Sequence, residues 1–119
     1  MFSPSASKVH PEQRRVPRFP FDSLVCVTAF RLGKKTQLWG RSTDLCRDGI
    51  GVTVSADLSS DEIVALQIQL PRAKIVTVNA WVRYCKQGRC GLEFRDPGHT
   101  EIEAIRAACE KLRRVDTQL

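Results

Sequence analysis

The sequence predicts a mainly β domain: a six-stranded antiparallel β-barrel with one C-terminal α-helix. Three observations lead to this fold class. From Ser23 onward, short runs of β-forming residues alternate with turn signals. After the segment "DPGHT", the apolar spacing changes from that of a strand to that of a helix. The chain of 119 residues is long enough for one domain with a hydrophobic core and too short for two.

The expected organisation of the chain follows from these changes of pattern. The N-terminal end is polar and lacks periodicity, which is typical of a flexible tail. The expected parts are a tail over 1–13, a single domain over 14–115, and a last tail over 116–119. Within the domain we expect an arginine loop over 14–22, the barrel over 23–95 and the helix over 100–114.

The first three strands are expected at Leu24–Phe30, Gln37–Leu45 and Gly49–Ser55. The first is rich in β-forming residues and ends at "RLGKK", a turn that contains Gly33. The second has a weaker strand pattern and is partly polar. The third alternates cleanly, with an apolar residue at every second position, so one of its faces is expected to point into the core.

Three more strands are expected at Glu62–Leu70, Lys74–Tyr84 and Arg89–Phe94. The first of these could also begin a helix, because the "SSDE" before it resembles a helix cap. Its alternation and the stop at Pro71 favour a strand. The other two are joined by "KQG", which makes them the best hairpin in the chain.

The expected helix begins at a capping box formed by Thr100 and Glu103. Its apolar positions recur at helical spacing, and most of its basic residues lie off that stripe. The apolar positions are Ile102, Ile105, Cys109 and Leu112. An amphipathic helix of this kind is expected to cover an opening or a flank of the barrel.

Composition indicates a globular protein with an anionic partner. The net charge is +6, with 42% hydrophobic and 27% charged residues. A basic balance favours a nucleic acid, a nucleotide or a membrane surface as partner. The longest apolar run, "LVCVTAF", is too short to span a bilayer, and the N-terminus lacks a secretory pattern. We therefore expect a cytoplasmic protein without membrane insertion.

The five cysteines do not suggest a metal site. Their number is odd, no CxxC pair occurs, and His10 and His99 lie far from any cysteine pair in the sequence. A hairpin would place Cys85 opposite Cys90, but we expect reduced thiols.

No catalytic constellation is present. The sequence offers no Ser-His-Asp arrangement, no paired histidines and no phosphate-binding glycine loop between a strand and a helix. Cys46 would be a nucleophile only beside a base, and nothing in the sequence supplies one. We therefore expect a protein that is not an enzyme and has no catalytic residues and no cofactor.

The arginine-rich segment "QRRVPRF" is the first candidate for ligand binding. Arg14 and Arg18 are four residues apart, and Pro17 between them stiffens the segment and disfavours a helix. Guanidinium groups bind phosphate bidentately, bond the O6/N7 edge of guanine and stack on bases. By itself, such a charge run is more often a solvated entry to a domain.

The segment "DLCRDG" is the second candidate. In extended chain, Asp44 and Cys46 point to the same face, and Gly49 allows close approach of the backbone. An exposed carboxylate can accept two parallel hydrogen bonds from the N1–H and N2–H₂ edge of guanine. Alone, this segment is typical of a β-turn.

Together, "RRVPR" and "DLCRDG" resemble the PilZ domain, the bacterial receptor module for cyclic di-GMP. The family pattern is RxxxR in an N-terminal loop, followed later by [D/N]xSxxG at one end of a strand. Arg14 and Arg18 match the first motif, and Asp44 and Gly49 match the second. Cys46 stands where the family has serine. The long strand, "CGLEF" and the terminal helix also fit the family's layout.

The resemblance implies a six-stranded barrel whose arginine loop closes over a dinucleotide on the outer face. Arg14 and Arg18 would contact phosphates and guanine edges, and Arg15 would add a phosphate contact. Asp44 and Cys46 would bind the other guanine and its neighbourhood.

Further roles at the ligand site are implied for two residues. Gly49 would complete the second motif. Trp81 would be the family's large side chain near the ligand, although a packing role fits it nearly as well.

The expected function is a receptor or adaptor whose N-terminal loop changes when cyclic di-GMP binds. It would signal to an unidentified effector protein, in motility or exopolysaccharide regulation. One alternative is a PilZ-like scaffold that has lost ligand binding, because the Cys46 thiol is a poorer hydrogen-bonding group than a hydroxyl. A weaker alternative is a barrel that binds single-stranded nucleic acid, for which aromatic residues, at 7%, are few.

Overall fold

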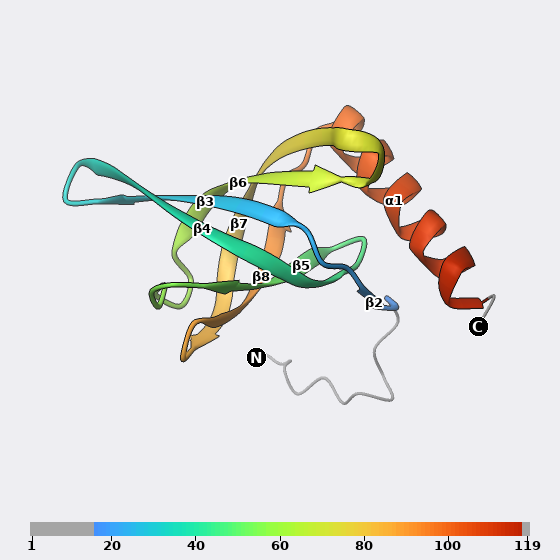
Figure 1. The fold of residues 1–119 in the computed structure, drawn as a ribbon. Helices are drawn as coiled ribbons and strands as arrows, with labels where there is room; N and C mark the ends of the chain where they lie inside the picture. The colour runs from blue at the N-terminus through green and yellow to red at the C-terminus, as the bar shows by residue number, and fades with distance from the viewer. Residues whose placement is uncertain (1–15, 118–119) are drawn as a thin grey trace, which may run out of the picture.

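A computed structural model describes residues 16–117, which form a closed antiparallel β-barrel and one helix (Figure 1). The predicted fold class is confirmed. The elements are β2 (Phe19–Pro20), β3 (Leu24–Arg31), β4 (Lys34–Leu45), β5 (Gly49–Val54), β6 (Ile63–Leu70), a 3₁₀ turn η3 (Pro71–Ala73), β7 (Lys74–Lys86), β8 (Arg89–Arg95) and α1 (His99–Thr117).

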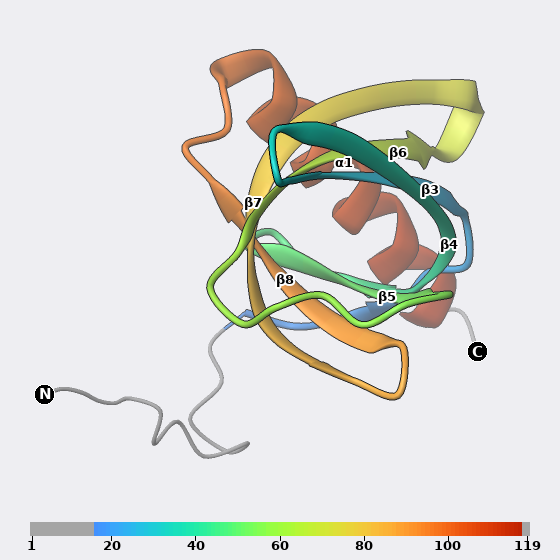
Figure 2. The same ribbon diagram turned by 90° about the vertical axis from the view of Figure 1, so that its left-hand side faces the viewer.

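The barrel closes because β4 pairs on both sides. The sheet order is β2-β4-β3-β6-β7-β8-β5, and an additional β4–β5 pairing joins the two ends of the six longer strands. Figure 2 shows the resulting ring of strands nearly end-on, with α1 behind it. The short strand β2 pairs with the end of β4. Because the barrel is closed, none of these six strands has a long unpaired edge. Any binding surface on the barrel wall therefore consists of outward-pointing side chains.

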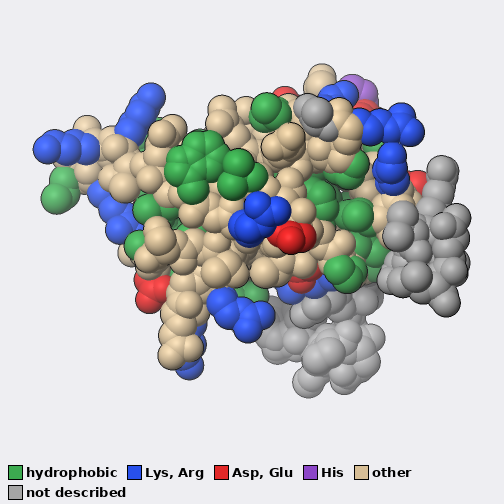
Figure 3. Space-filling model, in the orientation of Figure 1, with side chains coloured by type: hydrophobic (Ala, Val, Ile, Leu, Met, Phe, Trp, Pro, Cys, Tyr) green, Lys and Arg blue, Asp and Glu red, His purple; other side chains and the backbone are tan. Residues whose placement is uncertain are grey.

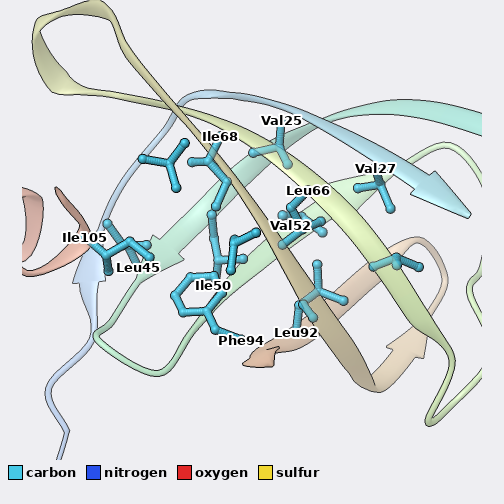
Figure 4. Packing of buried hydrophobic residues seen from close by; sticks show 14 of the residues in the cluster. Val25, Val27, Leu45, Ile50, Val52, Leu66, Ile68, Leu92, Phe94 and Ile105 are labelled. Atoms are coloured by element: carbon cyan, nitrogen blue, oxygen red, sulfur yellow. The ribbon is translucent and has the colours of Figure 1, made fainter. Parts of the chain in front are cut away.

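The core fills the barrel with the alternate residues of each strand, as strand geometry requires. In β6, for example, Val64, Leu66, Ile68 and Leu70 are buried, whereas Gln67 and Gln69 are exposed. Figure 4 shows that buried side chains from opposite strands, such as Val25 and Val52, point into the same interior. The outward residues between them are therefore free to serve binding.

Helix α1 covers one end of this core. Its buried residues are Ala104, Ile105, Ala108 and Cys109, at helical spacing. The helix begins at His99, so the predicted capping box of Thr100 and Glu103 is wrong. Gly98 precedes the first turn instead, and the Glu101 carboxylate folds back over it. Within residues 16–117, no helix has the length and apolar character needed to cross a bilayer.

The expectation of reduced thiols at Cys85 and Cys90 is wrong. Cys85 and Cys90 form a disulfide between β7 and β8. The cause is the register of the hairpin, which places these two residues directly opposite each other. Cys26, Cys46 and Cys109 are free thiols. The disulfide links the two strands of the β7–β8 hairpin one register row from its turn, close to the cavity described below.

Candidate ligand-binding site

The candidate site lies on the outer face of the barrel, on a row of residues that crosses four strands. The row runs through Asp44 of β4, Gly51 of β5, Gly91 of β8 and Tyr84 of β7, which are successive register partners. The two central positions have no side chain. They therefore leave room for the carboxylate at one end of the row and the aromatic ring at the other to lie over the sheet.

Two β-bulges turn the side chains of Asp44 and Tyr84 outward. The β4–β5 register shifts between Ser42 and Asp44, and the β7–β8 register shifts between Val82 and Tyr84. Such bulges add a residue to one strand and turn its side chain. As a result, Ser42 and Val82 are buried, whereas Asp44 and Tyr84 reach the surface.

The two side chains lie over the glycines between them. A Cβ atom added at Gly51 would come within 2.5 Å of Asp44 Oδ1, and one added at Gly91 would collide with the Tyr84 ring. These two glycines are therefore needed for the positions of Asp44 and Tyr84. Gly51 in "GIG" and Gly91 in "RCG" are the sequence signal for this arrangement, and our sequence analysis did not use it.

Asp44 is held by two contacts of different kinds. Its Oδ1 accepts a hydrogen bond from the Gly51 backbone N–H at 3.0 Å. Its Oδ2 forms an ion pair with Arg18 Nη1 at 3.3 Å, and both side chains are partly exposed. One carboxylate oxygen of Asp44 is thus held by the Gly51 backbone, and the other is paired with Arg18.

Strand β2 brings Arg18 to this position. Phe19 and Pro20 pair with Leu45 and Asp44 of β4, and the Phe19 side chain is buried in the core. Arg18 directly precedes this anchored pair, so its guanidinium reaches Asp44. The structure thus brings together one residue from each sequence motif. The predicted ligand residues Arg14 and Arg15, and the predicted tail over 1–13, lie outside the described residues.

A cavity of about 500 Å³ opens beside the Arg18–Asp44 pair, a size typical of small-molecule sites. Its lining comes from β4, β5, the β7–β8 hairpin and the segment before β2. The lining residues are Arg18, Thr43, Asp44, Val52, Tyr84, Lys86, Gln87, Arg89 and Cys90.

The charge of this cavity favours an anion. Three of its lining residues, Arg18, Lys86 and Arg89, are cationic, against the single carboxylate of Asp44. Lys86 and Arg89 are register partners at the end of the β7–β8 hairpin. Arginine and lysine in a partly enclosed space bind phosphate well. The hairpin cations escaped the sequence analysis because their approach to Asp44 depends on barrel closure and on both bulges.

Cys46 and Gly49 do not line the cavity. Cys46 is half-buried, and its backbone N–H donates to the Gly49 carbonyl oxygen at 3.0 Å. Its thiol lies on the side of α1: burial, and then the Cys46 thiol, raise the pKa of Cys109 to about 11. Gly49 lies against β8, where an added Cβ would collide with the Leu92 carbonyl oxygen.

Trp81 also lies outside the cavity lining, one row away on β7. It is half-buried, and its register partner is Glu93, which in turn pairs with Gly49. The Arg83 guanidinium lies 4.8 Å from the centre of the Trp81 ring and also bonds Glu93. Trp81 therefore shares an outer row with Gly49, next to the row of Asp44.

No cluster of three or more potential metal ligands occurs among the described residues 16–117. The side chains that gather at the cavity are cations, a carboxylate, hydroxyl groups and an amide. Such a set can bind and orient an anionic ligand that also carries hydrogen-bond donors.

Comparisons with known proteins give a family and a shared fold. The family model of the PilZ domain matches residues 12–111. The PilZ domain of YcgR from Escherichia coli, solved with c-di-GMP, superposes with a TM-score of 0.72 at 14% identity, covering 89% of this chain and 95% of that one. A search of curated proteins found no sequence match.

Two further solved structures have the same fold. The PilZ domain of CeSA from a cellulose-synthesizing bacterium gives a TM-score of 0.63 at 21% identity, covering 79% of this chain and 96% of that one. The inhibitor of motility MotI from Bacillus subtilis gives 0.67 at 18% identity, covering 89% of this chain and 53% of that one. At these identities the likeness demonstrates a shared fold.

Proposed function

Because this chain belongs to the PilZ domain family, we propose that it is a receptor for cyclic di-GMP that passes the signal to a partner protein. The observation that carries the proposal is the ion pair between Arg18 and Asp44 beside a cationic cavity. It joins the two sequence motifs at one place on the barrel. Cyclic di-GMP supplies the two chemistries that this place suits, phosphates and guanine edges.

Arg18 would exchange Asp44 for a ligand phosphate. The Arg18 and Asp44 side chains are 39% and 27% exposed, and ion pairs of this exposure contribute about 0–1 kcal/mol. Opening the pair therefore costs little. A bidentate contact between the guanidinium and a phosphate is stronger than the contact that it replaces. Lys86 and Arg89, which line the same cavity, would neutralise the second phosphate.

Asp44 would then bind a guanine. The Gly51 N–H keeps Oδ1 in place, so the departure of Arg18 frees Oδ2 without releasing the carboxylate. A carboxylate held in this way can accept from the guanine N1–H and N2–H₂ groups. Hydrogen bonds to a charged group contribute about 1.5–3 kcal/mol each.

The remaining predicted site residues are proposed as contributors to the same site. Arg14 and Arg15 would add phosphate and guanine contacts from the loop before β2. Trp81 and Gly49 lie on the neighbouring outer row, where a base could stack or approach the backbone. Cys46 would affect the site through the short turn that it forms with Gly49.

The segment that carries Arg18 would transmit the signal to the partner protein. Movement of Arg18 away from Asp44 changes the chain ahead of β2, and this change is the proposed message to an effector protein. Motility or exopolysaccharide production is the proposed setting, in line with the names of MotI and of the cellulose-synthesizing bacterium. The proposed role is binding and signalling in the cytoplasm, without catalysis.

Calorimetric titration with cyclic di-GMP tests the proposal, with GTP and an oligonucleotide as competitors. We expect micromolar or tighter binding, about −8 kcal/mol, and loss of detectable binding in Arg18→Ala with the barrel still folded. Arg14→Ala is expected to behave in the same way. Arg41→Ala is the matched control, because Arg41 also pairs with an aspartate from the same surface, Asp22, but lies outside the cavity. Wild-type affinity for cyclic di-GMP in Arg18→Ala or in Arg14→Ala would refute the proposed binding role of these arginines.

Cys46 favours a second candidate, a PilZ scaffold that acts through protein contacts alone. A thiol replaces the hydroxyl of the family motif, and its hydrogen bonds are weaker. This candidate predicts that the wild-type chain shows no heat of binding with cyclic di-GMP at any concentration. A saturable titration excludes it.

A further inference from the structure

The hairpin between β3 and β4 carries an apolar residue at its extreme tip. We call residues 30–35 the finger. Leu32 is fully exposed, at 101% of its reference area, and Phe30 behind it is 58% exposed. Figure 1 shows that the finger projects from the barrel at the end of the molecule opposite α1. Among residues 16–117, its tip therefore contacts no other element, and Leu32 has no packing role there.

The backbone also disfavours leucine at this position. Leu32 and Gly33 have φ angles of 52° and 76°, so both central residues of the turn are in the left-handed region. Asn or Asp followed by Gly is the usual pair in such a turn, and other side chains there are strained. The β7–β8 turn has the same geometry, with φ angles of 54° and 80°, and carries the polar pair Gln87 and Gly88. Neither the turn nor water favours Leu32, which points to a contact outside the chain.

The charge around the tip identifies the partner. No Asp or Glu occurs between residues 24 and 43, a stretch that contains four Lys and Arg residues. Arg31 is neutralised by Glu62. Lys34 and Lys35 are exposed, and neither has an ion pair within the described part of the chain. Figure 3 shows basic side chains gathered around this projecting end, with hydrophobic groups among them.

The groups are ordered along the finger. Leu32 lies at the tip, Lys34 one register row behind it and Lys35 opposite Phe30 in the next row. A bilayer has the same order, because the acyl boundary lies below a layer of phosphates. A protein pocket would require a complementary surface around the contact, whereas the finger is convex and narrow. A lipid surface requires only the correct depth for each group.

We propose that the finger docks on an anionic membrane surface, with Leu32 entering the headgroup–acyl boundary and Lys34 and Lys35 bonding lipid phosphates. The contact is peripheral and spans nothing. One leucine and two lysines give only weak binding, since even a single acyl chain anchors a protein marginally. The contact therefore orients a molecule that is already near the membrane. It is independent of ligand binding at the Arg18–Asp44 cavity.

Flotation with vesicles tests the proposal. The wild-type chain is expected to float with vesicles that contain phosphatidylglycerol, to float poorly with pure phosphatidylcholine, and to detach at high salt. Leu32→Asn is the decisive variant, because asparagine suits the left-handed turn. Its vesicle affinity should fall by about tenfold, the contribution of burying one leucine, while its melting temperature stays equal or rises. A structural role for Leu32 would lower both.

Two further variants complete the experiment. Lys34→Gln combined with Lys35→Gln should remove the preference for phosphatidylglycerol. Gln87→Asn, at the equivalent position of the other turn, should bind vesicles like the wild type. If the wild type does not float, or if Leu32→Asn floats equally well, the proposal is wrong, and Leu32 then serves a protein contact.

Discussion

At the scale of single residues, the position of Asp44 depends on the absence of a side chain at its neighbour. Gly51 donates its N–H to Asp44 Oδ1 and leaves room for the carboxylate above its Cα. The nearest atoms to an added Cβ at this position are the ends of two side chains, Asp44 Oδ1 and Thr43 Oγ1. Side-chain ends can move without disturbing the sheet, so the fold tolerates a methyl group where the binding geometry does not.

We therefore expect Gly51→Ala to fold normally and to bind cyclic di-GMP about tenfold more weakly, because the displaced carboxylate loses a charged hydrogen bond worth about 1.5–3 kcal/mol. Calorimetry gives the affinity, and circular dichroism melting gives the stability. Thr53→Ala is the control, because Thr53 is the next outward residue of β5 and is exposed. Equal affinities for the two variants would contradict the role of Gly51.

Cys46 is the one residue that departs from the family motif. It is half-buried on the side of α1 and outside the cavity lining. We expect Cys46→Ser to keep the wild-type affinity for cyclic di-GMP or to tighten it by at most about tenfold, the worth of one neutral hydrogen bond. A titration that shows clearly weaker binding for the serine variant would contradict this expectation.

At the scale of elements, the ion pair between Arg31 and Glu62 connects the last residue of β3 to the residue before β6. Arg31 reaches both carboxylate oxygens of Glu62, at 3.2 and 3.3 Å. Glu62 also accepts the Ser59 backbone N–H at 2.9 Å, so it holds the loop before β6. Burial alone would raise the pKa of Glu62, but the Arg31 and Ser59 hydrogen bonds outweigh it, and the pKa lies below the ordinary 4.5.

The sign of the pH effect follows from this direction. A carboxyl whose folded pKa is depressed stabilises the fold above the unfolded pKa and loses that contribution as pH falls through the folded value. We expect the wild-type advantage over Glu62→Gln to be at most about 1 kcal/mol at neutral pH and to disappear as the pH falls through the folded pKa of Glu62, which lies below 4.5. Urea unfolding at several pH values measures it. Glu103→Gln, in an exposed helical pair with Arg106, is the control variant.

The sequence predicted elements well where burial sets the pattern. The alternation of apolar residues located the strands that became β5 and β6 to within about one residue at each end. It missed the start of β4, because Lys34 to Thr36 are exposed and join the strand only through pairing with β3. It also missed β2, whose two residues have too little pattern to detect. Pairing partners, rather than local composition, define these segments.

The site was predictable only in part for a related reason. Arg18 and Asp44 carry motifs, so resemblance singled them out, and the structure places them in contact. Tyr84, Lys86 and Arg89 have no motif and reach the cavity because the ring of strands closes and two bulges turn its side chains. The hairpin was expected to place Cys85 opposite Cys90, and it does, but the disulfide was missed because reduced thiols were expected for a cytoplasmic protein. Contacts across the barrel depend on register, which one chain's composition does not specify.

At the scale of the whole molecule, the barrel separates its two proposed surfaces. The cavity lies over β4, β5, β7 and β8, whereas the finger extends β3 and β4 beyond the ring (Figure 1). The closed barrel between them is a rigid support, since all six strands pair on both sides. Ligand binding should therefore stabilise the entire domain as one cooperative unit, and its effect should be visible in global unfolding.

This coupling predicts that cyclic di-GMP raises the melting temperature of the domain. Ligand at one hundred times its Kd adds about 2.7 kcal/mol to the stability of the folded state, which raises the melting temperature of a domain of this size by about 10 °C. Arg18→Ala should melt at one temperature with and without ligand, whereas Leu32→Asn should shift as fully as the wild type. An unshifted wild type would favour the scaffold alternative, and a loss of the shift in Leu32→Asn would show that the finger and the cavity are coupled.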